Sequence, residues 1–244
     1  MEADWSRLSN IFVTETSKHP ELFDWLPTGP YDQESYTQTF NTVARNNPGA
    51  IIFAILLKRW TVRRERRANG GREAGDENED GGVEVFEVED GTFAGTIGLL
   101  NTDLGRSRTE MGHIVILPRF QRTFVGTHAH GLLLQHCLNP LSSGGLALRR
   151  VQWQANSLNK TSIRAAQRMG YQLEGIMRFE RVVPEGKAGV RAEGEAGEGK
   201  SMPMVDANGQ RLGNGRHSAM LAICWDDWMV GGGRERVLGM MGRD

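Results

Sequence analysis

The stretch from residue 151 to residue 175 reads VQWQANSLNKTSIRAAQRMGYQLEG, and it joins a strand pattern to a helix pattern. Residues 149–154 are typical of a β-strand and residues 159–169 of an α-helix. Gly170 follows, a residue type that often ends helices because it readily adopts a left-handed backbone. Asn159 and Ser162 stand at the start of the predicted helix, where they would cap free N–H groups, and Asn159 could also hydrogen-bond an amide-bearing ligand.

A second informative stretch precedes it, at residues 109–129, with the sequence TEMGHIVILPRFQRTFVGTHA. It predicts a strand over residues 109–117, a stop at Pro118, a turn, and a helix that carries an apolar face from Val125 to Cys137. The first N–H groups of a helix have no intrahelical acceptor, so together with the helix dipole they form a site for an anion such as phosphate. Arg119 and Arg122 would add positive charge there, although an ordinary turn has the same pattern.

The remaining periodicity predicts an α/β (α+β) fold with a mixed, mostly antiparallel sheet and helices on both faces. The predicted helices span residues 22–30 and 32–44, the second with Asp32 as its N-cap. Further strands are predicted over residues 50–60, 83–88, 92–100, 171–181 and 216–225.

Composition favours one domain over residues 1–244 with two flexible insertions, at 63–82 and 185–215, both rich in glycine and charge. The 29 basic and 30 acidic residues nearly cancel, which makes nucleic acid an unlikely partner. No apolar run approaches the roughly 20 residues that span a bilayer, and the N-terminus lacks a signal-peptide pattern. Cys137 and Cys224 lie in apolar runs, which is typical of reduced thiols and predicts a cytoplasmic protein.

These segments, in this order, resemble the GNAT acetyltransferase superfamily and, within it, the RimJ/RimL-like branch. The residues that carry the resemblance are Glu110, Gly112 and His113 in the strand, Gln121, Arg122 and Thr123 in the turn, and Asn159, Ser162, Ala166, Gly170, Tyr171, Glu174, Gly175 and Arg178 in the decisive stretch. The segments LFDWLPTGPY at 22–31 and GRHSAMLAICWDDW at 215–228 are also similar to that branch.

The resemblance implies a fold whose middle strands splay apart to take acetyl-CoA as co-substrate, with no metal. Its pantetheine arm would pair with backbone groups near Ile114, Ile116 and Leu117, while Asn159 would hold the arm and Ser162 would lie near the sulfur. The pyrophosphate would rest on the amides of the turn and first helical turn, namely Arg122, Thr123, Phe124, Val125, Gly126 and Thr127.

The chain departs from the family pattern at three places. Phe124 stands where the phosphate loop usually has its first glycine, and Ala166 stands where many relatives have a tyrosine acid. The strand that usually precedes the first helix is also missing from the pattern.

The resemblance implies direct transfer of an acetyl group to a primary amine, either a small amine, an amino acid or a protein N-terminus. Glu110 is the first candidate for the general base, through water, and His113 the second; Ser162 could protonate the leaving thiolate. Each has a structural alternative: a glutamate at the strand start that faces solvent or pairs with a nearby arginine, a hydrogen-bonded core histidine, and a helix cap.

Three other interpretations stay open or are set aside. The chain could bind acyl-CoA with little catalysis, as a sensor or interaction protein, which Phe124 and Ala166 suggest. The arginines at 63–67 could contact nucleic acid, but the acidic residues that follow can neutralise them. His128, His130 and His136 do not share the spacing of a metal site. The resemblance also allows a homodimer.

Overall fold

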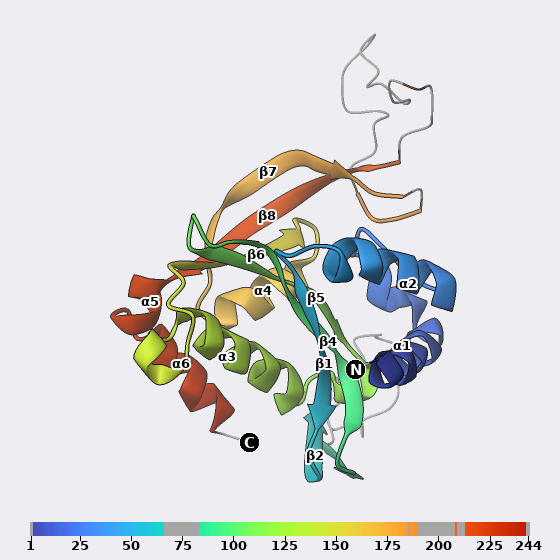
Figure 1. The fold of residues 1–244 in the computed structure, drawn as a ribbon, viewed down its shortest axis with the longest axis horizontal. Coiled ribbons are helices and arrows are strands. Elements are labelled where there is room, and N and C mark those ends of the chain that lie inside the picture. Colours follow the sequence, from blue (N-terminus) through green and yellow to red (C-terminus); the bar gives the residue numbers. More distant parts are fainter. Residues whose placement is uncertain (1, 66–82, 185, 190–207, 209–212, 243–244) are drawn as a thin grey trace, which may run out of the picture.

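The computed structural model describes residues 2–65, 83–184, 186–189, 208 and 213–242. Its centre is a six-stranded sheet in the order β1-β4-β5-β6-β8-β7 (Figure 1). The strands are β1 (Ile51–Leu57), β4 (Thr92–Asp103), β5 (Arg108–Ile116), β6 (Arg150–Asn156), β8 (Gly215–Cys224) and β7 (Gln172–Val182). Neighbours run antiparallel except β5 and β6, which are parallel. The prediction of an α/β fold with a mixed sheet is therefore confirmed.

Helices cover both faces of this sheet (Figure 1). One face carries α3 (Phe124–Leu138), α4 (Lys160–Arg168), α5 (Trp225–Met229) and α6 (Gly233–Met241), and the other carries α1 (Glu2–Ser17) and α2 (Gln33–Phe40). Short helical turns occupy Pro20–Phe23, Asn41–Arg45, Pro118–Phe120 and Leu141–Ser143. No helix in the described ranges is both long and apolar enough to cross a membrane.

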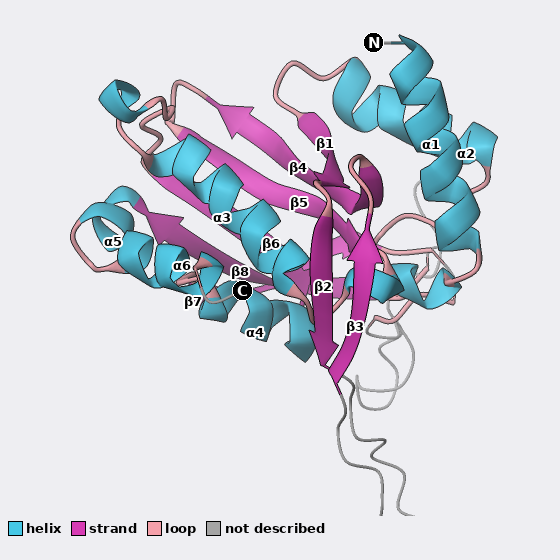
Figure 2. Cartoon of the chain, turned by 90° about the horizontal axis from the view of Figure 1, so that it is seen from below, coloured by secondary structure: helices cyan, strands magenta, loops and turns pink. Residues whose placement is uncertain are grey.

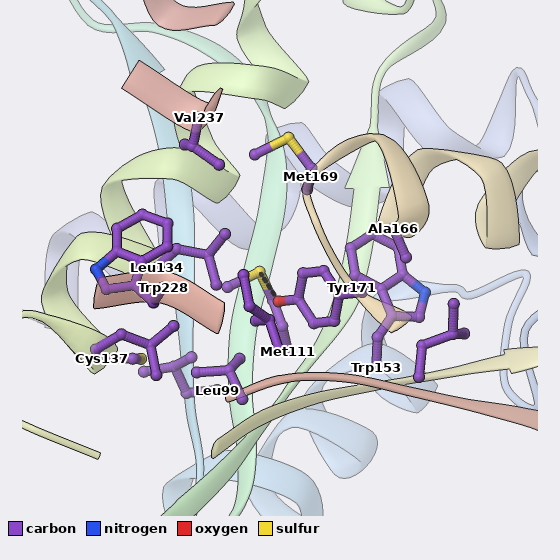
Figure 3. Close-up of a cluster of buried hydrophobic side chains, with 14 of the residues drawn as sticks. Leu99, Met111, Leu134, Cys137, Trp153, Ala166, Met169, Tyr171, Trp228 and Val237 are labelled. Carbon is purple, nitrogen blue, oxygen red and sulfur yellow. Dashed lines mark hydrogen bonds between the residues drawn. The ribbon is translucent and has the colours of Figure 1, made fainter. Parts of the chain in front are cut away.

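Each face of the sheet has its own apolar core. Under α3 and α4 the core is centred on Met111, Trp153 and Leu221, and Figure 3 shows Tyr171 next to Met111, with Trp153 on the other side of the Tyr171 ring. The core under α1 and α2 is built around Phe12, Tyr36 and Val115. β5 contributes to both cores: Met111 packs under α3 and α4, whereas Val115 packs on the opposite side, because an irregularity in the register between them changes the alternation of side chains.

Several boundaries differ from the prediction. The expected strand 50–60 divides into β1 and β2 (Trp60–Glu65), and β2 pairs with β3 (Val83–Val88) as a separate two-stranded sheet (Figure 2). The expected insertion at 63–82 therefore starts inside a strand, where Arg64 forms an ion pair with Glu84 at 3.4 Å. Its remainder, 66–82, lies outside the described residues, as does most of the expected insertion at 185–215.

The helix expected at 22–30 is wrong in extent, because only Pro20–Phe23 forms a helical turn. Pro27 and Pro30 each lack a backbone N–H, so a regular helix cannot run through them. The helix at 32 begins as predicted: Asp32 accepts a hydrogen bond from the N–H of Ser35 at 2.8 Å, and the Asp32 N–H donates to the Ser35 hydroxyl at 3.1 Å.

Two helices at the ends of the described chain, α1 and α6, were not predicted. Among the described residues no strand precedes α1, so β1 forms an edge of the sheet. The sequence of α1 does carry the spacing of an amphipathic helix, at Trp5, Leu8 and Phe12. All three side chains pack in the core under α1 and α2.

Candidate functional site

The neighbouring strands β5 and β6 are paired over the first part of their length and then separate. We call the space between their separated parts the gap. Their pairing runs from Arg108 with Arg150 to Met111 with Trp153 and ends there, although β5 continues to Ile116 and β6 to Asn156. Each strand keeps its other neighbour over this part, β5 pairing with β4 and β6 with β8. Beyond Met111, the edge of β5 that faced β6 therefore has no strand partner.

A β-bulge marks the point of separation. Thr96 of β4 pairs with Val115 and Gly98 pairs with Gly112, so two β5 residues, His113 and Ile114, stand opposite a single residue. His113 has a left-handed backbone with φ of 48°, and its carbonyl accepts a hydrogen bond from the Thr96 hydroxyl at 3.2 Å. A bulge bends its strand and increases the local twist, which is a physical reason for β5 to turn away from β6.

The open edge of β5 presents specific backbone groups. The N–H of Leu117 donates to the carbonyl of Ala94 on β4 at 2.9 Å. Because backbone groups alternate sides along a strand, the N–H and C=O of Ile116 point away from β4. The Gln121 side chain donates to that Ile116 carbonyl at 3.0 Å. The Ile116 N–H points to the same side, where no strand of the described residues pairs with it.

The turn after β5 delivers the chain to the N-terminus of α3. Thr123 is the N-cap, and its hydroxyl accepts a hydrogen bond from the Val125 N–H at 3.2 Å. By their position the N–H groups of Thr123, Phe124 and Gly126 have no intrahelical acceptor. A Cβ placed on Gly126 would meet no atom within 4 Å, so its surroundings are open. This end of α3 has the charge and the free donors of an anion site.

Phe124 packs along the side of α3. Its ring lies edge-on to His128 with centroids 5.0 Å apart, and it also touches the core under α1 and α2. The residue that replaces the expected glycine is therefore engaged by contacts within the protein.

Glu110 lies one residue before the last pair that joins β5 to β6. Its side chain is buried, and one carboxylate oxygen, Oε2, accepts hydrogen bonds from the amides of Asn101 at 3.1 Å and Gln152 at 3.2 Å. The other oxygen, Oε1, accepts no hydrogen bond from a described residue. The Glu110 carboxylate is thus held in place through Oε2, and its Oε1 has no described hydrogen-bond donor, close to the point where β5 and β6 separate.

His113 lies at the bulge itself, and burial lowers the pKa of its imidazole. Its ring is therefore neutral at neutral pH, the form in which a histidine can accept a proton.

Asn159 and Ser162 form the first turn of α4, as the helix pattern predicted. Asn159 Oδ1 accepts the Ser162 N–H at 3.0 Å, while its Nδ2 donates to no described residue. The Ser162 hydroxyl accepts the indole N–H of Trp153 at 3.1 Å. Ser162 is thereby tied to the strand from which β5 departs.

The pair of Trp153 and His130 lies beside this turn. Their rings stack with centroids 4.9 Å apart, and His130 Nδ1 donates to the Gly126 carbonyl at 2.7 Å. Burial lowers the pKa of His130 to about 4, so it is neutral in the folded protein. The stacking of His130 on Trp153 connects the first turns of α3 to β6.

The position expected for a tyrosine acid is filled by the core. Ala166 is completely buried, and Figure 3 shows it beside Trp153 and Tyr171. The hydroxyl of Tyr171 points at the Met111 sulfur, 3.8 Å away. Neither residue presents an acid to the gap.

The sheet face opposite α4 carries a set of polar side chains that the sequence motifs did not indicate. We call this set the polar row: Gln152, Gln154, Glu180, Arg181, Arg216 and Ser218. Arg181 donates to Glu180 through Nε at 2.6 Å and to Gln154 through Nη2 at 2.8 Å. The signal was present in the alternation of polar and apolar residues along 150–156, which places polar side chains on one face.

The structure thus places Glu110 in the last paired part of β5 and places His113, Ile114 and Ile116 where β5 has left β6, with the start of α3 following directly. Two of the three histidines considered as metal ligands have separate partners: His128 bonds the carbonyl of Met241 at 2.9 Å, whereas His130 bonds that of Gly126. In the described chain the ligand atoms of Cys224, Asp226 and Asp227 do gather within 4.8 Å. Asp227 there caps the N–H of Cys224 at 2.9 Å, which accounts for its position.

Comparisons with known proteins bear on the family and on the fold. The family profile described as Acetyltransferase (GNAT) domain matches residues 3–172. No curated protein matches the chain.

Solved structures share the fold at low sequence identity. A GCN5-related N-acetyltransferase from Brucella melitensis has a TM-score of 0.62 at 19% identity, covering 96% of this chain and 77% of that one. RimJ from Mycobacterium smegmatis, in complex with CoA-disulfide, has a TM-score of 0.54 at 14% identity, covering 98% and 85%. Spermidine N-acetyltransferase from Vibrio cholerae, in complex with CoA and spermine, has a TM-score of 0.53 at 10% identity, covering 92% and 93%. With the family profile spanning more than half of its length, this chain belongs to the GNAT acetyltransferase family.

Proposed function

We propose that the protein is an acetyl-CoA-dependent N-acetyltransferase of the RimJ/RimL-like branch, acting on a primary amine in a ternary complex. The observation that carries this proposal is the separation of β5 from β6 beyond Met111 and Trp153, followed directly by the capped start of α3. An open strand edge binds an extended amide-bearing arm, as in strand addition, and a helix N-terminus binds a diphosphate. Acetyl-CoA contains both, and the structure of RimJ from Mycobacterium smegmatis is a complex with CoA-disulfide.

The residues present fit this co-substrate. The Ile116 N–H is a free donor on the open edge, and Asn159 Nδ2 is a second donor across the gap. The N–H groups of Thr123, Phe124 and Gly126 would hold the pyrophosphate, with the exposed Arg122 near by. The Gln121 side chain already donates to the Ile116 carbonyl. We therefore expect the N–H of Ile116, rather than its C=O, to hydrogen-bond acetyl-CoA.

Acetyl-CoA supplies the acetyl group: a C–N bond forms as the thioester C–S bond breaks, the amine loses one proton and the sulfur leaves as the thiol. The protein's main task is to hold the amine in line with the reacting carbon. The free backbone N–H of Ile116 would stabilise the negative charge that develops on the thioester oxygen.

Glu110 would accept the amine proton, directly or through one water. Its free Oε1 and the two amides that fix Oε2 favour this role over that of a solvent-facing glutamate. His113, held neutral by burial, is the second candidate. Ser162 would donate a proton to the departing sulfur, since its hydroxyl hydrogen is not consumed by the bond that it accepts from Trp153.

Both cysteines are free thiols, which suits a reducing cytoplasm. The acceptor would be a small amine, an amino acid or a peptide N-terminus.

The test is release of free thiol from acetyl-CoA across a panel of amines, with calorimetric titration of CoA run in parallel. Turnover with at least one amine supports the proposal. Tight CoA binding without turnover on any amine would replace it with the alternative, an acyl-CoA-binding protein of the same fold. Absence of CoA binding by a folded sample would refute both.

A further inference from the structure

The polar row contains two arginines side by side. Arg181 of β7 pairs in register with Arg216 of β8. On β8, Ala219, Leu221 and Ile223 point into the core under α3 and α4, so Ser218 and Arg216 point to the opposite face, the face that carries Glu110 and Gln152. Two cations therefore lie next to each other on the sheet face beside the candidate base.

One of the two arginines is neutralised within the protein. Arg181 contacts both oxygens of Glu180, through Nε at 2.6 Å and Nη2 at 3.0 Å. Glu180 also accepts the Ser218 hydroxyl at 2.9 Å. Both oxygens of this carboxylate thus accept hydrogen bonds from Arg181, and Oε2 also accepts the Ser218 hydroxyl, so its direct contacts are with residues other than Arg216.

Arg216 forms no direct ion pair with a described carboxylate, although Glu180 and Glu110 lie close enough to act on its charge. Its side chain is 4% exposed, and its Nε is buried without a hydrogen-bond partner among the described residues. Burial first, and then the neighbouring Arg181, lower its pKa, and the carboxylates of Glu180 and Glu110 only partly oppose this. Buried charges in proteins are normally paired, so this guanidinium has the properties of a site prepared for an anion.

The position of this cation relative to Glu110 suggests what the anion is. Gln152 donates to Glu110, and Gln154 accepts from Arg181. The two glutamines are two residues apart on β6 and share a face, which separates them by about 7 Å along the strand. The polar row thus runs from a carboxylate that can take an amine proton to a pair of guanidinium groups at a short distance.

We propose that Arg216, assisted by Arg181, binds a carboxylate on the acceptor, and that the acceptor is an amino acid whose amine faces Glu110. This inference rests on the proposed function. A guanidinium presents a fork of N–H donors that matches a carboxylate, whereas it repels a polyamine. A peptide N-terminus carries an amide where the amino acid carries this carboxylate.

The experiment measures kcat/KM by thiol release for matched pairs that differ only in the anion: glycine with glycinamide, L-alanine with L-alaninamide and L-methionine with L-methioninamide. Spermidine and an alanine-starting tripeptide amide serve as further acceptors. The carboxylate raises the pKa of the neighbouring amine, so at neutral pH each amide is intrinsically more reactive. Preference for the amino acid by tenfold or more in at least one pair is the expected result, and it would run against that intrinsic order.

The decisive variant is Arg216→Gln, with Arg106→Gln as the matched control. Arg106 is an exposed arginine in the β4–β5 turn that pairs with Asp103 at 3.5 Å. Loss of a charged hydrogen bond corresponds to about tenfold to hundredfold in kcat/KM. We expect that loss for the amino acid, little change for its amide, and none for either substrate with Arg106→Gln.

A second measurement covers the case in which Arg216→Gln folds poorly. Calorimetry of the wild-type protein with CoA present compares N-acetyl-L-methionine, a product of the proposed reaction, with N-acetyl-L-methioninamide. Tighter binding of the free acid by at least tenfold supports the proposal. Equal binding of the two, or wild-type kinetics that favour the amide, spermidine or the tripeptide amide, overturns it while leaving the transferase function standing. No turnover with any amine refutes the proposed function instead.

Discussion

Gly126 offers a substitution that should move stability and cofactor affinity in opposite directions. It is the third residue of α3, and a Cβ added there meets no atom within 4 Å. Gly126→Asp should therefore fold without a clash. A carboxylate in the first turn of a helix stabilises it by about 0.3–1 kcal/mol, and replacing a helical glycine adds a few tenths more. For a protein of this size we expect a rise in melting temperature of about 1–4 °C.

The same carboxylate should repel the pyrophosphate of CoA. At about 5 Å and an effective dielectric constant between 40 and 80, each pair of like charges costs ~1–2 kcal/mol. Two phosphate charges then cost about 2–3 kcal/mol, which corresponds to a Kd raised by roughly 30- to 150-fold. Because the interaction is partly exposed, the difference from wild type should shrink as salt is raised.

The assay is calorimetric titration of CoA at two salt concentrations, with thermal unfolding of the same samples. Gly239→Asp is the control, since Gly239 lies in α6 and its Cβ position is equally open. An unchanged Kd for Gly126→Asp would refute the assignment of the α3 N-terminus as the diphosphate site. A lower melting temperature would refute the claim that this position is open.

Three further outcomes follow from the site and its surroundings. Glu110→Gln should lower kcat/KM by about 10²–10³-fold at neutral pH without changing the Kd of CoA. The loss in kcat/KM should become smaller at high pH, because more of the amine is already neutral there. An equal loss at every pH would exclude Glu110 as the base. Burial lowers the pKa of His130 to about 4, so between pH 6.5 and 4 the unfolded chain binds more protons than the folded one and stability falls as the pH falls. In urea unfolding, wild type should lose about 2 kcal/mol more than His130→Phe between pH 7 and pH 5, and equal losses would contradict a neutral buried histidine. Burial raises the pKa of the Cys137 thiol to about 12, so a thiol reagent should modify Cys137 only after unfolding, as mass spectrometry of the labelled peptide can show.

Much of the fold could be predicted from the sequence because interactions between residues close together in the chain determine it. The Asp32 cap, the strand at 108–116 with its stop at Pro118, and the helix from Asn159 to the glycine at 170 all use interactions within a few residues. The motif order along 109–175 also placed Glu110, His113 and the start of α3 in one neighbourhood. These features need only short-range contacts and a sheet whose strands follow one another.

Sequence reading failed where partners far apart in the chain decide the outcome. The break between β1 and β2 depends on whether a residue near 60 pairs with β4 or with β3, and local propensity is the same for both. Arg181 and Arg216 become neighbours only through the β7–β8 pairing, across a connection that no local pattern specifies.

By itself, the amino-acid sequence determined which segments form strands and helices in the central part of the chain and which family they resemble, because periodicity, caps and prolines act locally. Three further facts came only from the three-dimensional arrangement: β5 leaves β6 after Met111, the Gln121 side chain donates to the Ile116 carbonyl, and Arg216 is buried next to Arg181. Those three facts depend on the register between strands and on burial. Both arise when distant segments pack, so they cannot be read from neighbouring residues.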